Sequence, residues 1–125
     1  SLCSAALKAT GGSANLKYAS KSALDFGALS SAARKKVKTM QYVFDAKEAY
    51  SLCVMQAKNA SQAKSLLGTL KSYKKRNCKS DYTAAEKQVF QNAVCGQKGK
   101  YVWYIAMSPK KDVNMKGQTA LKKKL

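Results

Sequence analysis

Two segments of this chain alternate like β-strands yet stay apolar on both faces, and this pattern constrains the fold more than any other. In residues 49–57 the alternation separates the apolar side chains into two sets: Tyr50, Leu52 and Val54 on one face, and Cys53 and Met55 on the other. Successive side chains of a strand point to opposite faces of a sheet, and a strand that is apolar on both faces is typical of a sheet interior. We therefore expect a central strand here, covered on at least one side by helices.

Residues 100–108 form the second such segment. Their alternation places on one face Tyr101, Trp103, Ile105 and Met107, and on the other Val102, Tyr104 and Ala106. Pro109 ends the strand because proline cannot donate a ladder hydrogen bond. Residues 39–44 are also rich in strand-forming side chains, and the polar residues 45–48 that link them to residues 49–57 indicate a β-hairpin. A further strand begins at Val94.

Helical spacing of apolar residues predicts the remaining elements. A short helix is expected over residues 2–9, stopped by Gly11, and a second one from about 22 to 36. The clearest helix spans residues 59–77, where apolar residues recur at i, i+3 and i+4 and cations occupy the last turn, as the helix dipole favours.

Two further helix starts carry capping signals. Thr83 and Glu86 have the spacing of a capping box, so a helix begins near Tyr82. The inner face of that helix is expected to carry Ala85, Val89, Phe90 and Ala93. Asp112 is the expected N-cap of a last helix, whose apolar residues are Val113, Leu121 and Leu125.

Together these elements predict a single α+β domain over residues 1–125. A small, mainly antiparallel sheet, built from the hairpin and the C-terminal strands, packs against helices. The N-terminal helical part spans about residues 1–37, and the hairpin, two helices, strand and final helix span about residues 38–125. The longest uninterrupted apolar run, residues 101–107, is far too short to cross a bilayer.

The chain is strongly basic, with 24 lysines and arginines against six acidic residues, no histidine and a net charge of +18. The arginines are Arg34 and Arg76, and all other cations are lysines. Lysine is a hydrated point charge, whereas arginine makes planar bidentate contacts to phosphates and bases. The excess therefore indicates diffuse attraction to polyanions rather than sequence-specific reading of a nucleic acid. A solvated, self-repelling surface explains the same charge without any partner.

Basic clusters close two of the predicted helices, and these are the candidate polyanion contacts. They comprise Lys71, Lys74, Lys75 and Arg76 in one helix, and Lys122, Lys123 and Lys124 in the other. The helix dipole alone also favours cations at these ends.

A candidate aromatic surface lies where lysines frame Tyr101, Trp103 and Tyr104. Exposed aromatic side chains on a strand can stack nucleobases. The competing interpretation is that these are core residues packed under a helix. It is favoured because Lys100 stands where an RNA-recognition strand has its first aromatic residue.

Several chemistries are excluded by composition. Without histidine the chain cannot build a Ser–His–Asp or Cys–His nucleophile or a histidine-bearing metal site. Six scattered acids nominate no carboxylate pair, and the glycine-rich phosphate-binding motifs are absent. We therefore expect no enzymatic activity, no metal and no cofactor. A hydrolase that uses a Ser–Lys or Cys nucleophile stays open as a further alternative.

The four cysteines, Cys3, Cys53, Cys78 and Cys95, show no C-x-x-C spacing. Two disulfides with three connectivities stay open in an oxidising compartment. Buried free thiols are the default interpretation, above all for Cys53 and Cys95, which have apolar neighbours in the sequence.

The order of elements from Tyr42 onward is similar to that of a known family. The similar features are a strand over residues 49–58 that runs into an asparagine-started helix ending in Lys75-Arg76, a Tyr82-x-x-x-Glu86 helix start, and Asn92-Ala93-Val94 leading through residues 98–102 into an apolar strand that ends at Ser108. Over roughly the C-terminal two-thirds, the chain resembles a family of small, uncharacterised bacterial envelope proteins, mostly lipoproteins, filed as domain of unknown function four-three-five-eight.

This resemblance implies an α+β fold and an exported protein tethered outside the cytoplasmic membrane, with no known activity, cofactor or catalytic residue. Cys3 follows Leu2, where a lipidation site has a small residue, so any anchor is expected upstream of Ser1. The first hypothesis is a non-enzymatic envelope or secreted domain that is attracted through its lysines to an anionic cell-wall polymer, membrane headgroups or an acidic protein. The alternative is a small intracellular nucleic-acid-binding protein that uses the same charge and the aromatic residues of the 100–108 strand.

Overall fold

The alternating segments pair into one antiparallel sheet with the strand order β1-β2-β3-β5-β4. The computed structural model describes residues 2–11, 17–18, 29–45, 49–79 and 82–125. Its four main strands are β2 (Val37–Asp45), β3 (Tyr50–Ala57), β4 (Val94–Lys98) and β5 (Tyr101–Ala106), and the two-residue β1 (Lys17–Tyr18) pairs with β2. Its helices are α1 (Leu2–Ala9), α2 (Ser31–Arg34), α3 (Ala60–Asn77), α4 (Ala84–Gln91) and α5 (Lys111–Lys123). The predicted single α+β domain with a mainly antiparallel sheet is confirmed.

The predicted hairpin is formed by β2 and β3, in a register that pairs Tyr42 with Cys53 and Val43 with Leu52. On its other side β3 pairs with β5, where Cys53 stands opposite Tyr104. The segment 49–57 is therefore a central strand, as its two apolar faces predict.

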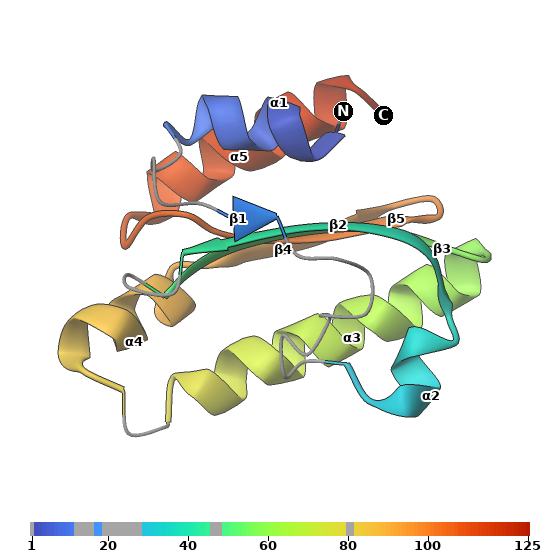
Figure 1. Cartoon of the computed structure of the whole chain (residues 1–125), viewed down its shortest axis with the longest axis horizontal. Coiled ribbons are helices and arrows are strands. Elements are labelled where there is room, and N and C mark those ends of the chain that lie inside the picture. Colours follow the sequence, from blue (N-terminus) through green and yellow to red (C-terminus); the bar gives the residue numbers. More distant parts are fainter. Residues whose placement is uncertain (1, 12–16, 19–28, 46–48, 80–81) are drawn as a thin grey trace.

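Helices cover both faces of this sheet, so the molecule has three layers (Figure 1). One face packs against α2, α3 and α4 through a core cluster that includes Cys53, Met55, Leu66, Leu70 and Tyr104. The opposite face packs against α1 and α5 through a second cluster, which includes Cys3, Leu52, Trp103, Ile105 and Leu121. The alternation of β3 and β5 thus supplies both cores, one from each face.

Capping explains where two of the helices begin. The side chain of Asn59 accepts a hydrogen bond of 2.8 Å from the backbone N–H of Gln62 and starts α3. Thr83 and Glu86 form both bonds of the predicted capping box at α4. The predicted helix over residues 2–9 is α1, with the same bounds.

Three local expectations are corrected by the structure. The helix predicted over about 22–36 is confined, among the described residues, to α2, because Ser30 accepts a hydrogen bond from the backbone N–H of Ala33 and acts as an N-cap; residues 22–28 lie outside the described part. Lys110, not Asp112, is the N-cap residue of α5, which places Asp112 in the first turn. Ala85 is exposed rather than on the inner face of α4.

Trp103 is the largest fully buried side chain, and the local sequence makes room for it. Gly96 stands opposite Trp103 in the β4–β5 ladder, and a Cβ atom at Gly96 would lie 2.5 Å from Cζ2 of the indole. The indole N–H donates a hydrogen bond of 2.9 Å to Gln118 of α5. This contact fixes α5 against the sheet.

Candidate anion-binding surfaces

The first predicted basic cluster lies in the last turns of α3, and two of its four cations make contacts within the protein. The ammonium group of Lys74 donates a hydrogen bond of 2.9 Å to the carbonyl oxygen of Ala93. The Arg76 guanidinium lies 5.8 Å from the ring centroid of Tyr73. Lys71 and Lys75 are exposed. Lys74 therefore holds α3 to the start of β4, and Lys71 and Lys75 are the more available contacts for a partner.

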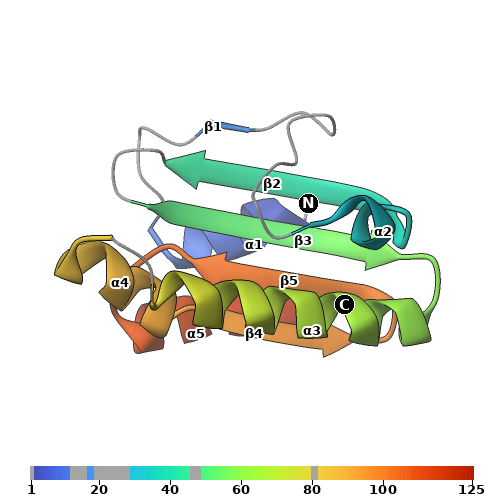
Figure 2. The same cartoon turned by 90° about the horizontal axis from the view of Figure 1, so that it is seen from below.

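The second predicted cluster, Lys122 to Lys124, ends α5 and is exposed. Because α3 and α5 cover opposite faces of the sheet, and their C-terminal ends point to opposite ends of it, the two clusters do not merge into one surface (Figures 1 and 2). A flat polyanion can contact one of them at a time.

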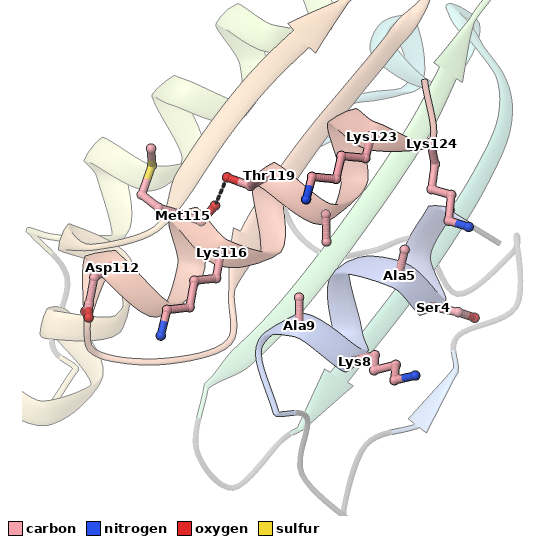
Figure 3. Close-up of a pocket in the computed structure, with 11 residues that line it drawn as sticks. Ser4, Ala5, Lys8, Ala9, Asp112, Met115, Lys116, Thr119, Lys123 and Lys124 are labelled. Carbon is pink, nitrogen blue, oxygen red and sulfur yellow. Dashed lines mark hydrogen bonds between the residues drawn. The ribbon is translucent and has the colours of Figure 1, made fainter.

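The structure instead joins part of the α5 cluster to lysines that sequence reasoning did not select. A groove of about 1060 Å³ runs between α1 and α5 on their outer side. Its lysines are Lys8 of α1, Lys116 and Lys123 of α5, and Lys124, which directly follows α5 (Figure 3). All four are exposed, and among the described residues Asp112 is the one acidic residue that lines the groove.

The floor of the groove, between the two helices, is apolar and made of small side chains. It consists of Ala5 and Ala9 from α1 and Ala120 from α5. Thr119 and Met115 also line the groove, but both are exposed on the outer side of α5, and Met115 points away from α1 (Figure 3). Met115 is 41% exposed and is one of the two large apolar side chains that stand out at the described surface. An apolar floor with a cationic rim suits an anionic partner that also has an apolar face.

The two helices can lie close together because Gly117 faces α1. A Cβ atom at Gly117 would lie 2.7 Å from Cγ2 of Thr10 and 3.5 Å from the carbonyl oxygen of Ala6. Thr10 is itself fixed, because its hydroxyl donates to the carbonyl oxygens of Ala6 and Leu7 at 3.1 and 3.0 Å. The groove is thus the outer side of a tight helix–helix contact.

The candidate aromatic surface is not available for stacking. Trp103 and Tyr104 are both fully buried, and they belong to the cores on opposite faces of the sheet. Tyr101 is half-buried and lines a shallow groove with Leu2 and Gln41. Trp103 and Tyr104 are core residues packed under helices, as the competing interpretation expects, because β5 is an interior strand with helices on both sides.

The four cysteines are free thiols in the described structure. Cys3 and Cys53 are buried, and burial raises the pKa of both thiols, that of Cys3 to about 11. The thiol of Cys53 donates a hydrogen bond of 3.0 Å to the sulfur of Met40. Of the expected buried thiols, Cys53 is confirmed, whereas Cys95 is half-buried.

Cys95 lies beside two lysines, but its burial outweighs their effect on the thiol. It lies on β4 in a groove of about 290 Å³ that is also lined by Lys71 and Lys74. Nearby cations favour a thiolate. The loss of hydration outweighs them, so that the pKa of Cys95 is raised to about 11. At neutral pH this thiol is protonated and a poor nucleophile.

No cluster of three or more metal-ligating side chains occurs within the described ranges. None of the helices in that part of the chain is long and apolar enough to cross a membrane. No family model, curated protein or solved structure matches the chain.

Lys8 and Lys116 were missed from the sequence, although a signal for them exists. Along α5 the groove residues recur at Asp112, Met115, Lys116, Thr119, Ala120 and Lys123, which is the spacing of one helix face. This face is separate from the sheet-facing one, which carries Asn114, Gly117 and Leu121. That α1 lies beside this second face follows from the tertiary fold.

Proposed function

We propose that the chain is a non-enzymatic domain that acts outside the cytoplasm and binds an anionic partner through its lysines. The groove between α1 and α5 carries the proposal, because it gathers four exposed lysines around an apolar floor. A solvated surface needs its lysines dispersed, whereas a binding surface needs them convergent. The extracytoplasmic location is a proposal drawn from the order of elements from Tyr42 onward, and no family model matches the chain.

The alternative, a nucleic-acid-binding protein, loses support from the burial of Trp103 and Tyr104. Sequence-tolerant binding of single strands relies on aromatic side chains that stack bases. The charge alone provides a weak, salt-sensitive attraction to any polyanion, nucleic acids included.

The binding proposal is tested by titrating the protein with anionic polymers over a range of salt concentrations. The probes are polyglycerol phosphate, polyglutamate and single-stranded DNA, with neutral dextran as the control. If the four groove lysines make the contact, the logarithm of the binding constant falls against the logarithm of salt with a slope of about −3. Absence of binding to every anionic probe at low salt would refute the proposal. Preference for single-stranded DNA over the other polymers at matched charge would favour the nucleic-acid alternative.

The proposed location has its own test. Fractionation of cells that make the full-length protein from its natural gene should recover it in the envelope or the medium. Recovery in the cytosol would contradict the location and leave the binding proposal standing.

Thiol counting on the denatured, purified protein is expected to find four reactive cysteines, in keeping with four free thiols in the fold.

A further inference from the structure

The groove between α1 and α5 has a shape that restricts what can occupy it. The lining residues of α5 run from Asp112 to Lys124, which corresponds to a length of about 18 Å, or about three helical turns. Both walls are helices, and they meet at the close contact of Gly117 with Thr10. A concavity between two adjacent helices is the shape into which a third helix packs.

The side chains of the floor also favour a helix as the occupant. Ala5, Ala9 and Ala120 are half-buried and end at Cβ, which lets a partner backbone approach closely. A bilayer surface would need large apolar side chains that insert between headgroups, and the floor residues Ala5, Ala9 and Ala120 are all small.

The rim specifies the charge of the occupant. Lys8 and Lys116 lie on different helices and flank one stretch of the groove, and Lys123 and Lys124 flank the other end (Figure 3). A second copy of this chain is disfavoured, because each copy carries a net charge of +18. The complementary partner has carboxylates on both sides of an apolar stripe.

We propose that this groove is the docking site for an acidic amphipathic helix of a partner protein. The helix lays its apolar stripe on Ala5, Ala9 and Ala120 and places glutamates or aspartates against the lysines of the rim, in the helix-in-groove mode of recognition. This inference rests on the proposed function, since it names the class of the anionic partner.

The test uses a synthetic, fluorescein-labelled 18-residue peptide. The peptide carries leucine and alanine at i, i+3, i+4 and i+7, glutamates at the flanking positions and blocked ends. Its control has the same composition in an order that scatters the leucines around the helix. Fluorescence anisotropy with the full chain at 150 mM salt is expected to show binding of the amphipathic peptide at least tenfold tighter than that of the scrambled peptide. Equal binding of the two peptides, or no binding of either, would overturn the proposal.

Two charge-reversed variants separate the groove from the rest of the surface. Lys116→Glu/Lys123→Glu reverses two rim lysines. The α3 variant, Lys58→Glu/Lys64→Glu, reverses one exposed lysine just before α3 and one on α3, away from the groove and from the cations at the end of α3. Both variants have the same net charge. The groove variant is expected to weaken peptide binding about tenfold or more, and the α3 variant less than twofold. Equal losses would show general electrostatic attraction and overturn docking in the groove.

Steric variants test the floor without a change of charge. Thr119→Phe and Ala120→Phe each fill the groove and are expected to weaken peptide binding about tenfold. Thr119 is exposed, so that Thr119→Phe leaves the core intact even if Ala120→Phe unfolds the protein; circular dichroism and the melting temperature check this. Unchanged binding by folded Thr119→Phe would contradict the proposal.

A lipid arm and a polymer arm distinguish the remaining outcomes. In the lipid arm, vesicles of phosphatidylcholine with phosphatidylglycerol replace the peptide. If the protein binds these vesicles but not the peptide, and Lys116→Glu/Lys123→Glu loses this binding, helix docking is overturned in favour of a membrane surface. In the polymer arm, both charge-reversed variants are titrated with polyglutamate. If they bind it with equal affinity and the protein does not bind the peptide, the docking site is refuted while the broader anion-binding proposal stands. Failure of every anionic probe would refute both.

Discussion

Asn114 is a buried polar side chain of α5 that joins this helix to two loops, the one between α4 and β4 and the one between β5 and α5. It is fully buried, its amide nitrogen donates to the carbonyl oxygens of Asn92 and Ser108 at 3.0 and 2.9 Å, and its oxygen accepts from the backbone N–H of Met107 at 2.9 Å. Replacement by alanine leaves these three backbone groups without their partner and opens a cavity. We expect Asn114→Ala to lower the free energy of unfolding by about 3 kcal/mol, measured by urea denaturation.

The control for this prediction is Thr119→Ala, on the exposed side of the same helix. It should change the free energy of unfolding by less than about 0.5 kcal/mol. A loss in Asn114→Ala no larger than that of the control would show that these hydrogen bonds are not important for stability.

Cys95 makes stability depend on alkaline pH. Burial raises the pKa of its thiol to about 11 from an ordinary value of 9.0, so the folded state holds this proton more tightly than the unfolded chain. The resulting stabilisation is complete below pH 9 and is lost as the pH rises through 11. The difference in unfolding free energy between the wild-type protein and Cys95→Ala should therefore shrink between pH 9 and pH 11. A difference that is independent of pH over this range would contradict the raised pKa.

At the level of elements, Gly117 sets the distance between α1 and α5. Alanine normally stabilises a helix by about 1 kcal/mol relative to glycine, but here its Cβ would lie 2.7 Å from Cγ2 of Thr10 and 3.4 Å from Cγ2 of Ile105. We expect Gly117→Ala to lower the melting temperature because overpacking of this kind costs about 1–3 kcal/mol. Thr10→Ser removes the clashing methyl group and keeps the hydroxyl, so the double variant should recover most of the loss.

Gly68 of α3 provides the matched comparison. It is exposed, and no atom lies within 4 Å of the position its Cβ would take. Gly68→Ala should therefore raise the melting temperature. If Gly117→Ala stabilised the protein as much as Gly68→Ala does, the two helices would not be in the close contact that defines the groove.

The elements that sequence predicts well are those whose two ends or two faces carry independent signals. β3 and β5 alternate apolar residues on both faces, and α3 and α4 begin with capping residues that the structure confirms. The misplaced elements lack such signals. The apolar spacing over about 22–36 runs through Ser30, although Ser30 is the N-cap of α2. α5 begins at Lys111 without a side-chain cap, so the sequence pattern favours Asp112 as the nearest capping residue.

At the level of the whole molecule, the candidate site depends on distances that sequence does not contain. The lysines at the ends of α3 and α5 could be selected from the helix pattern, but the sheet separates them, and Lys8 joins Lys123 only because α1 and α5 cover the same face (Figure 1). The residues near each other in space are more than 100 positions apart in the chain. Burial of Trp103 similarly follows from the position of β5 inside the sheet.

The net charge of +18 on 125 residues should itself limit stability. Like charges repel one another in the folded state, and added salt screens this repulsion over a shorter Debye length, from about 30 Å at 0.01 M to about 8 Å at 0.15 M. We therefore expect the melting temperature to rise by several degrees between these sodium chloride concentrations. Lys64→Glu/Lys75→Glu lowers the charge away from the groove and should melt higher than the wild-type protein in 0.01 M salt, with a smaller rise on adding salt. A melting temperature that falls with salt would show instead that attractive ion pairs outweigh the repulsion.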